Sequence, residues 1–266
     1  MQMEQYNQIK TQVWKLLRID LNHYKPEQMC RRLDSWLIRS NTSTWELYFD
    51  RLKNEPAELE KFRNYLTINV SEFFRDSDRW LTLRSQVLPD LLAANQQKGL
   101  SRAGLRIWSA GCSTGQEPYT LAIMMDELAP TGNHTILATD LDRGALTKAM
   151  ARGPYSEDDL RNVSKERRTK YFEAGGPPYF VKASTGRLVK FRELNLLLDT
   201  FETNLDLIVC RNVIIYFTNE AKAELYKRFQ AALRPGGVLF VGGTEVIPRP
   251  NEIGFRSFGI SFYKKE

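Results

Sequence analysis

Ile107–Thr120 reads IWSAGCSTGQEPYT, an apolar run that ends at a turn bracketed by two glycines and restarts as a helix. The apolar residues up to Trp108 indicate the end of a buried strand. Gly111 and Gly115 permit backbone conformations that a Cβ obstructs, and Pro118 suits the first turn of a helix because its missing N–H would have no partner there. The stretch therefore predicts a strand, a nucleotide-sized hollow and a helix N-terminus.

A second apolar run, Ile136–Thr139, ends on Asp140. A lone glycine-rich turn is weak evidence for a ligand and is equally compatible with a structural turn. Asp140, however, follows Gly115 at close to the roughly 20-residue offset at which an acid on the second strand meets a ribose hydroxyl. Together the two features predict a Rossmann-like α/β fold with a nucleoside site.

The loop itself indicates which nucleoside is bound. A pyrophosphate site needs several free backbone N–H groups and often a Lys or Arg near the helix start. This loop has no basic residue and carries Glu117, whose carboxylate suits a cationic ligand and repels a phosphate. S-adenosylmethionine has an adenosine, an ammonium and a sulfonium but no phosphate. We therefore predict an S-adenosylmethionine pocket, with a dinucleotide as the weaker alternative.

Composition predicts a soluble, intracellular protein without a metal centre. With 42% hydrophobic and 26% charged residues, the 266-residue chain should be globular. No run approaches the roughly 20 apolar residues of a membrane helix, and the N-terminus lacks an apolar signal stretch. The cysteines Cys30, Cys112 and Cys210 are odd in number and scattered, which excludes a disulfide framework.

A net charge of +6 and an isoelectric point near 9.2 suggest an acidic partner. Nucleic acid, an anionic membrane and an acidic protein surface all remain open. The basic excess is concentrated near the N-terminus, on Lys10, Lys15, Arg18, Lys25, Arg31, Arg32 and Arg39. Arg31 and Arg32 lie on the outer face of a helix predicted over 26–39, which is either a solvated surface or a docking face.

The N-terminal part of the chain should be a small all-helical unit. Apolar residues at helical spacing predict helices over 4–18 and 26–39, and Leu59, Phe62 and Leu66 mark another. No strand pattern appears before residue 68.

INVSEFFRD, Ile68–Asp76, connects this unit to a helix predicted at about 78–97. Its Asn69, Ser71 and Arg75 stand beside two phenylalanines. A helix cap and a surface charge would explain these polar residues without any ligand.

The remainder follows an alternating strand and helix pattern with one interruption. The predicted elements are a helix over 142–150, a strand over 205–210, a helix over 219–233, a strand over 238–242 and a last apolar stretch over 255–263. The segment 154–190 is polar, and we interpret it as an inserted subdomain. It contains a predicted hairpin, with strands over 179–183 and 188–191 around Ser184–Arg187.

Arg211 and Asn212 follow the strand over 205–210 at its carboxyl end, where open α/β sheets place ligands. Tyr216 comes shortly after them. A structural ion pair for Arg211 and a packing role for Tyr216 are equally compatible with the sequence.

Several motifs, in this order, closely resemble the chemotaxis receptor methyltransferases of the CheR family. They are NVSEFFRD from Asn69, WSAGCSTGQEPYTLA from Trp108, ATDLD from Ala138, ELNLL from Glu193 and LIVCRNVIIYF from Leu207. The resemblance runs over nearly the whole chain. It implies a cytoplasmic S-adenosylmethionine-dependent enzyme that esterifies glutamate side chains on the cytoplasmic helices of chemoreceptors.

The resemblance also implies a domain organisation. An all-helical N-terminal domain with its linker would occupy 1–76 and dock the receptor through Arg31 and Arg32. A Rossmann-like methyltransferase domain would occupy 77–266, with a mostly parallel, doubly wound sheet and an antiparallel final strand. A small antiparallel β-subdomain would be inserted at about 154–192.

Matching residue by residue assigns the site. With Gly111 of the turn, the cofactor-binding residues are Asn69, Ser71, Arg75, Gly111, Glu117, Asp140, Asn195, Leu196, Arg211 and Asn212. Arg75 and Tyr216 would face the transferred methyl group. Gln116 departs from the family, which usually has Glu there. Gly175–Tyr179 is shorter than the glycine-patterned loop of members that bind a receptor's C-terminal pentapeptide, so we expect a pentapeptide-independent enzyme of the Bacillus type.

Two other functions compete with this prediction. The basic isoelectric point invites a nucleic-acid methyltransferase, but the chain has neither an Asn/Asp-Pro-Pro-aromatic motif nor a Pro-Cys nucleophile after the strand that ends at Cys210. A non-catalytic S-adenosylmethionine-binding signalling protein is the second. Methylation of a carboxylate needs no general base at neutral pH, and we expect His23 and His134 to lie away from the site.

Overall fold

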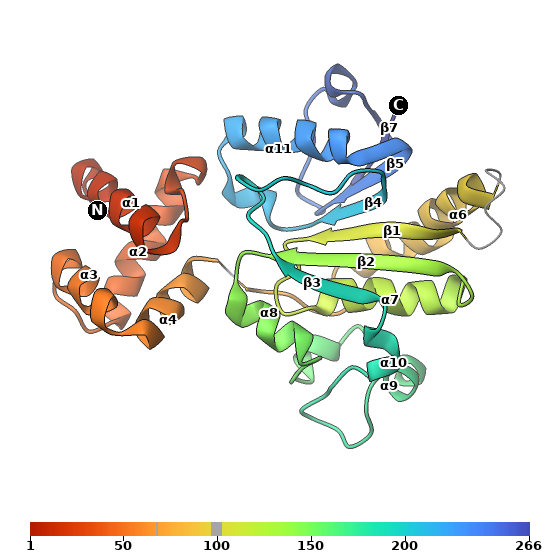
Figure 1. Ribbon diagram of the computed structural model, residues 1–266, viewed down its shortest axis with the longest axis horizontal. Coiled ribbons are helices and arrows are strands. Elements are labelled where there is room, and N and C mark those ends of the chain that lie inside the picture. The colour runs from red at the N-terminus through yellow and green to blue at the C-terminus, as the bar shows by residue number, and fades with distance from the viewer. Residues whose placement is uncertain (68, 97–102) are drawn as a thin grey trace. The chain divides into compact units, whose positions relative to one another are not determined.

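The computed structural model of the protein describes residues 1–67, 69–96 and 103–266, which divide into two compact units (Figure 1). One contains residues 1–69 and 214–224, and the other contains residues 70–213 and 225–266. Ile68 and the end of the helix predicted to reach residue 97 lie outside the described residues. Within the described ranges, no helix is long and apolar enough to span a membrane.

The first unit is helical. Its main helices are α1 (Met3–Leu17), α2 (Pro26–Arg39), α3 (Trp45–Asn54) and α4 (Pro56–Leu66), with a short 3₁₀ helix over Leu21–His23. The three predicted helices are confirmed. The sequence pattern did not predict α3, although the Thr44 hydroxyl caps it by accepting from the Leu47 N–H, and Trp45, Tyr48 and Leu52 bury one face.

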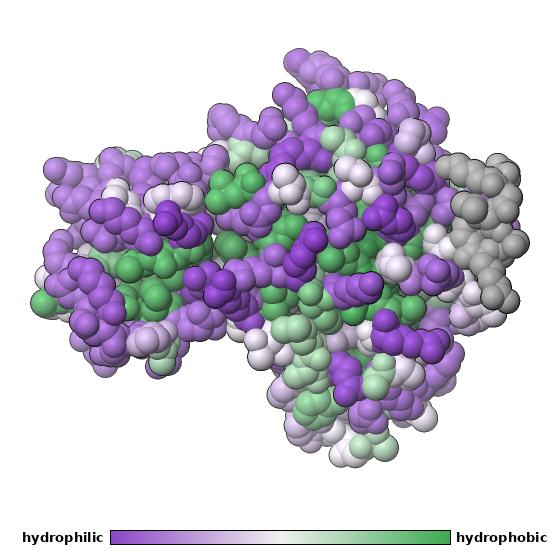
Figure 2. Space-filling view, viewed as in Figure 1, coloured by the Kyte–Doolittle hydropathy of each residue, from purple (hydrophilic) through white to green (hydrophobic). Residues whose placement is uncertain are grey.

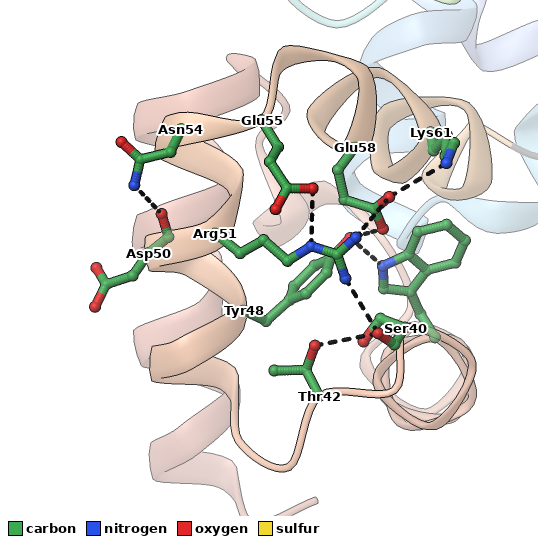
Figure 3. Close-up of polar contacts among 10 residues, drawn as sticks. Ser40, Thr42, Tyr48, Asp50, Arg51, Asn54, Glu55, Glu58 and Lys61 are labelled. Atoms are coloured by element: carbon green, nitrogen blue, oxygen red, sulfur yellow. Dashed lines mark hydrogen bonds and ion pairs between the residues drawn. The ribbon is translucent and has the colours of Figure 1, made fainter.

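A buried carboxylate connects α3 to α4 (Figure 3). Glu58 is only 7% exposed, accepts a hydrogen bond from the Tyr48 hydroxyl (3.3 Å) and pairs with Arg51 Nη2 (3.4 Å). Arg51 also donates to the Glu55 carboxylate (3.0 Å) and to the Ser40 carbonyl just after α2 (3.2 Å). Because a buried acid is costly without partners, this network favours a single packing of the three helices.

The second unit is built on a sheet of seven strands in the order β3-β2-β1-β4-β5-β7-β6 (Figure 1). The strands are β1 (Ala103–Ala110), β2 (Asn133–Asp140), β3 (Val189–Glu193), β4 (Leu205–Cys210), β5 (Leu233–Val241), β6 (Phe255–Ser257) and β7 (Phe262–Lys265). The strands β1 to β5 pair in parallel, and β7 pairs antiparallel with both β5 and β6. This confirms a mostly parallel, doubly wound sheet with an antiparallel final strand. Every residue of β4 is buried, as its near-continuous apolar run, interrupted only by Asp206, predicts.

Helices accompany these strands. They are α5 (Ser77–Thr82), a π-helical turn (Leu83–Val87), α6 (Leu88–Gln96), α7 (Gln116–Leu128), α8 (Arg143–Met150), α9 (Lys165–Tyr171), α10 (Ala183–Gly186) and α11 (Asn219–Ala232), of which α11 begins in the first unit. The helix predicted from 78 onwards is thus present with a π turn inside it. Hydrophilic residues cover much of the face in Figure 2, with hydrophobic residues between them, as the charged fraction of the sequence indicates.

The hairpin predicted over 179–191 is wrong. Residues 183–186 form α10, in which the Lys182 carbonyl accepts from the Thr185 and Gly186 N–H groups, both at 3.1 Å. The second predicted strand is β3, which pairs in parallel with β2 and joins the main sheet. Two isolated bridges, Tyr155 to Tyr179 and Phe172 to Val181, are the antiparallel pairs described within 154–192. Alternating apolar and polar residues identify a strand but do not show which strand it pairs with. Here the segment pairs with the edge of β2.

Candidate cofactor site

The glycine-bracketed turn joins β1 to α7 as predicted. Gly111 and Gly115 have φ values of +83° and +96°, which favour glycine. The N–H groups of Gly111 and Cys112 donate to the Thr139 carbonyl on β2 at 2.8 and 2.9 Å. A Cβ on Gly111 would lie 2.4 Å from Val213 Cγ2, so a larger residue cannot occupy this position without displacing its neighbour.

Asp140 ends β2 beside this turn. Its Oδ2 accepts from the Ser113 N–H (2.7 Å) and its Oδ1 accepts from the Asp142 N–H (2.9 Å). Burial raises the pKa of the Asp140 carboxyl to about 6, although these backbone donors act in the opposite direction. The carboxylate therefore holds the turn in place, a role that the sequence pattern did not predict.

Glu117 is another acid at the same edge of the sheet, and it is buried. Its Oε1 accepts from the Ser109 hydroxyl (2.8 Å), and its Oε2 lies 3.8 Å from Arg211 Nη1. Burial raises the pKa of the Glu117 carboxyl to about 7, and the nearby Arg211 charge opposes that rise. A carboxyl in this state gains most from a cationic neighbour, because such a neighbour stabilises the ionised form.

Arg211, at the end of β4, links the strand to the segment 70–76. Its Nη2 donates to the Arg75 carbonyl (2.8 Å) and to the Asp76 carboxylate (2.6 Å). Its guanidinium also lies over the rings of Trp80 and Phe240, at 5.2 and 5.0 Å. Burial lowers the pKa of Arg211. The structural ion pair that the sequence left open is present, and the same side chain also reaches Glu117.

Asn212 is held by an acid that sequence reasoning missed. The carboxylate of Glu245 accepts from the Asn212 N–H (3.0 Å) and from the Gly242 N–H (2.6 Å), and it is buried. Asn212 has a φ of +59°, a conformation that asparagine adopts more readily than most residues. Glu245 lies in the turn after β5. An acid that closely follows a predicted strand is the sequence signal that could have identified it.

The predicted residues of the segment 70–76 are also near this edge. Arg75 is half-buried and donates to the Val70 carbonyl (3.0 Å). Both its neighbours, Phe74 and Asp76, have positive φ, at 52° and 60°, which is uncommon for such residues and marks a strained turn. Ser71 and Arg75 line one hollow, together with Val70, Glu72, Asp158, Asp159 and Arg161.

Asn195 and Leu196 follow β3 on the other side of Asp140. The register pairs Asp140 with Glu193, and the Leu194 N–H donates to the Asp140 carbonyl (3.0 Å). The Asn195 side chain accepts from the Leu197 N–H (2.9 Å). The second unit therefore brings Arg75, Gly111, Glu117, Asp140, Asn195, Leu196, Arg211 and Asn212 to the carboxyl ends of its parallel strands. Ser71 lines the hollow that Arg75 shares with Asp158 and Asp159.

Two family sequence models match the chain over nearly its whole length. The sequence model of the family described as "CheR methyltransferase, SAM binding domain" matches residues 69–263, and the one described as "CheR methyltransferase, all-alpha domain" matches residues 4–67. The chain belongs to the CheR methyltransferase family. Its sheet unit is therefore an S-adenosylmethionine-binding domain, as the acidic loop predicts.

Individual CheR methyltransferases are similar along most of their length. A chemotaxis protein methyltransferase of Listeria monocytogenes is 42% identical over 94% of this chain and 92% of its own. Chemotaxis protein methyltransferase 1 of Pseudomonas aeruginosa is 42% identical over 88% of this chain and 86% of its own. The resemblance inferred from the motifs is thereby confirmed.

The other residues assigned from the CheR resemblance, Asn69, Tyr216, Arg31 and Arg32, belong to the first unit. Asn69 is exposed, and Tyr216 is half-buried, with its carbonyl accepting from the Lys25 N–H (3.0 Å). Arg31 is exposed on α2, as predicted.

Arg32 departs from the predicted solvent-facing position. It is half-buried, donates to the Tyr65 carbonyl and lies 4.5 Å from the centre of the Tyr65 ring. The Tyr65 hydroxyl donates to the Arg32 carbonyl in return (3.0 Å). The aromatic ring on α4 attracts the guanidinium because a cation binds favourably to a ring face. Arg32 therefore joins α2 to α4.

His134 lies at the start of β2, the end of the strand opposite Asp140. Its Nδ1 accepts from the Leu105 N–H (3.0 Å), and its Nε2 lies 2.9 Å from the Ala129 carbonyl. Both ring nitrogens therefore contact backbone polar groups of the fold. The expectation that His134 lies away from the site is confirmed.

Proposed function

We propose that this CheR methyltransferase transfers the methyl group of S-adenosylmethionine to glutamate side chains of chemoreceptors, forming glutamate methyl esters. Both relatives are chemotaxis protein methyltransferases, which supports a chemoreceptor substrate. The observation that carries the proposal is the pair of acids at the carboxyl edge of the sheet, the buried Glu117 and the half-buried Asp140, whose carboxyl pKa values are both raised. The helices that carry the substrate glutamates belong to the cytoplasmic part of a chemoreceptor, so the reaction would take place in the cytoplasm.

The residues of the site fit the proposed cofactor. Glu117 would bind its ammonium and Asp140 its ribose hydroxyls. Arg211 Nε is buried without a hydrogen-bond partner among the described residues, so the guanidinium can still serve an anionic group such as the ligand's carboxylate. Contacts to the rest of the molecule would come from Asn69, Ser71, Arg75, Gly111, Asn195, Leu196 and Asn212.

In the proposed reaction the main contribution of the protein is to position the substrate carboxylate. Bound S-adenosylmethionine supplies an electrophilic methyl group on its sulfonium. A glutamate carboxylate is already ionised at neutral pH, since its usual pKa is about 4.3, and it attacks without a base. Arg75 would hold this carboxylate through two N–H groups, and Tyr216 would orient it with a hydroxyl. Holding the oxygen in line and excluding water would supply the rate enhancement.

Incubation with methyl-labelled S-adenosylmethionine and receptor-containing membranes tests this function. We expect label in the receptor that mild base releases as methanol, because esters are base-labile and methylated amines are not. Label in added nucleic acid would overturn the proposal. Binding of S-adenosylhomocysteine without transfer to any receptor would identify a non-catalytic binding protein.

Cofactor affinity should rise with pH. The free protein must lose the proton of Glu117, whose pKa is raised to about 7, before the ammonium can pair with it. The dissociation constant for S-adenosylhomocysteine should therefore fall between about pH 6 and about pH 8, by up to about tenfold per unit below the pKa. Without ligand the sign reverses: a raised folded pKa means that stability is lost as pH rises from 4.5 to about 7.

Calorimetric titrations of the parent and of Glu117→Gln across this range provide the measurement. The variant should bind more weakly above pH 7 and lose most of the pH dependence. An unchanged slope in the variant would assign the titration to another group, of which Asp140 is the nearest candidate because its pKa is also raised, to about 6.

Receptor docking should involve the exposed part of α2. Chemoreceptor methylation helices expose glutamates, and Arg31 offers a guanidinium suited to such carboxylates. Arg32 would contribute indirectly, since it is committed to Tyr65. Arg31→Glu should raise KM for the receptor up to about fivefold, as an exposed ion pair contributes about 1 kcal/mol or less.

Steady-state methylation at low salt measures this change, with Lys53→Glu on α3 as the matched control for charge reversal. S-adenosylhomocysteine affinity should stay at the parental value in both variants. Parental KM in Arg31→Glu would show that this face is an ordinary solvated surface. Binding of a receptor pentapeptide and of nucleic acid, and insertion into the membrane, are not part of the proposed mechanism.

A further inference from the structure

A buried amide lies between the glycine turn and the inserted segment. Gln116, at the start of α7, is 1% exposed. Its Oε1 accepts from the Thr114 hydroxyl (2.8 Å), and its Nε2 donates to Asp159 Oδ1 (2.9 Å). Asp159 Oδ2 in turn accepts from the N–H and the hydroxyl of Ser156, both at 2.8 Å. Both carboxylate oxygens of Asp159 therefore have donors.

The same two residues hold the segment that carries Arg75. The Phe73 N–H donates to the Asp159 carbonyl (3.0 Å). The Phe74 N–H donates to the Thr120 hydroxyl (3.2 Å), which itself donates to the Gln116 carbonyl (2.8 Å). The pair thus connects three parts of the second unit: the glycine turn, the segment 70–76 and the inserted segment.

An amide at position 116 satisfies both of its neighbours without gaining or losing a proton. The ionised Asp159 carboxylate can only accept, so its partner must donate, whereas the Thr114 hydroxyl, which donates to Gln116 here, uses an acceptor at the same side chain. A glutamate at position 116 could donate to Asp159 only when protonated. Once ionised, it would place two carboxylate oxygens about as close as the present contact, which strongly disfavours the doubly charged form.

We propose that Gln116 and Asp159 are positioning residues of the cofactor site. Their contact fixes the glycine turn against the segment 70–76 and so sets the affinity for S-adenosylmethionine without touching it. The inference rests on the cofactor contacts proposed above for Glu117 and Arg75. Glutamine does not ionise, so position 116 adds no pH dependence to the cofactor affinity of this chain. The proposal predicts that a carboxyl introduced there makes the affinity depend on pH.

The first test is Gln116→Glu, with S-adenosylhomocysteine titrated at about pH 6 and about pH 8.5. At the lower pH the introduced carboxyl, when protonated, can replace the amide, and affinity should stay within about threefold of the parent. At the higher pH the ratio of variant to parental dissociation constants should increase at least about tenfold, because one linked proton allows up to tenfold per unit. Forming the ratio removes the pH dependence of Glu117 and Asp140, which both proteins share.

Other charged groups face the pair and are common to all variants. Glu72, Arg75, Asp158 and Arg161 line the same hollow as Asp159, and the Tyr155 hydroxyl donates to the Thr114 carbonyl (2.7 Å). Glu72 and Arg161 form an ion pair with each other. Because these groups remain unchanged, a pH effect confined to Gln116→Glu is assigned to the new carboxyl.

The second test exchanges donor and acceptor. In Asp159→Asn alone, the new NH₂ group faces either Gln116 Nε2 or the Ser156 N–H unless the Gln116 amide turns over and gives up the hydrogen bond that it accepts from Thr114. Either way the present contact is changed, so affinity should fall at both pH values. In Gln116→Glu/Asp159→Asn, the new amide at position 159 can donate to the new carboxylate at position 116 while its oxygen accepts from Ser156, and every partner is satisfied. The double variant should regain affinity to within about threefold of the parent and lose the pH dependence.

Gln96→Glu, an exposed position at the end of α6, is the matched control and should bind like the parent at both pH values. If Gln116→Glu does not fold, as thermal unfolding would report, Asp159→Asn and the double variant still decide the question. Parental affinity of Gln116→Glu at the higher pH, or additive losses in the double variant, would overturn the inference. A parental protein that fails to bind S-adenosylhomocysteine would instead contradict the proposed cofactor contacts.

Discussion

Asp140→Ala should raise the dissociation constant for S-adenosylhomocysteine about a hundredfold. The carboxylate would bind ribose hydroxyls, and two hydrogen bonds to a charged acceptor contribute roughly 3 kcal/mol together. The alanine also removes the acceptor of the Ser113 and Asp142 N–H groups, which hold the glycine turn beside β2. Isothermal titration calorimetry measures the loss directly.

Unfolding free energy should change much less than affinity in this variant. Burial disfavours the charged Asp140, as its raised pKa indicates, so its removal relieves a desolvation cost while two backbone hydrogen bonds are lost. Asp206→Ala is the matched control. Asp206 is another acid of the sheet, buried at the start of β4, where it accepts from the Arg106 N–H (2.7 Å) and Arg234 Nε (2.5 Å).

The control should be less stable than the parent, because it leaves the nearly buried Arg234 without its carboxylate, yet its folded fraction should bind S-adenosylhomocysteine normally. If Asp140→Ala binds with parental affinity, Asp140 has only the structural role seen in the turn. If both variants lose affinity equally, the loss reflects general destabilisation of the sheet.

The sheet and its ligand edge could be predicted from local sequence because each strand carries its own signal. The run Leu205–Cys210 is apolar in all but Asp206, and Gly111 stands where a positive φ is needed. The partner of a strand is a long-range property, and this is why the apolar residues of β3 were wrongly assigned to a hairpin when they pair with β2.

Contacts between polar residues that are far apart in the chain likewise could not be predicted from the sequence. A helical pattern placed Arg32 on the outer face of α2, but only the fold brings Tyr65 of α4 to it. In the same way Glu245 meets the Asn212 N–H, and Asp159 meets Gln116, across long stretches of chain. Residue types predicted the chemistry of the site, whereas the structure supplied the partners that hold its residues.

Arg75→Ala should lower turnover by about a hundredfold or more while S-adenosylhomocysteine affinity changes by only a few fold. The side chain is half-buried and one of its N–H groups donates to the Val70 carbonyl, so the guanidinium retains donors for a carboxylate. Losing those donors would leave the incoming glutamate free to rotate out of line, and positioning supplies much of the rate in such displacements. Single-turnover methylation with enzyme in excess measures the chemical step apart from product release.

Arg75→Lys separates charge from geometry. A lysine keeps the positive charge but cannot donate two parallel N–H groups to one carboxylate, so it should recover only part of the lost rate. Arg84→Ala, on the π turn, removes another partly exposed arginine, one that pairs with Glu127 at 3.6 Å, and it should leave both the rate and the affinity at parental values. If Arg75→Ala lowers only the cofactor affinity, Arg75 is a binding residue only. Its guanidinium would then serve the bound cofactor and would not orient the substrate carboxylate.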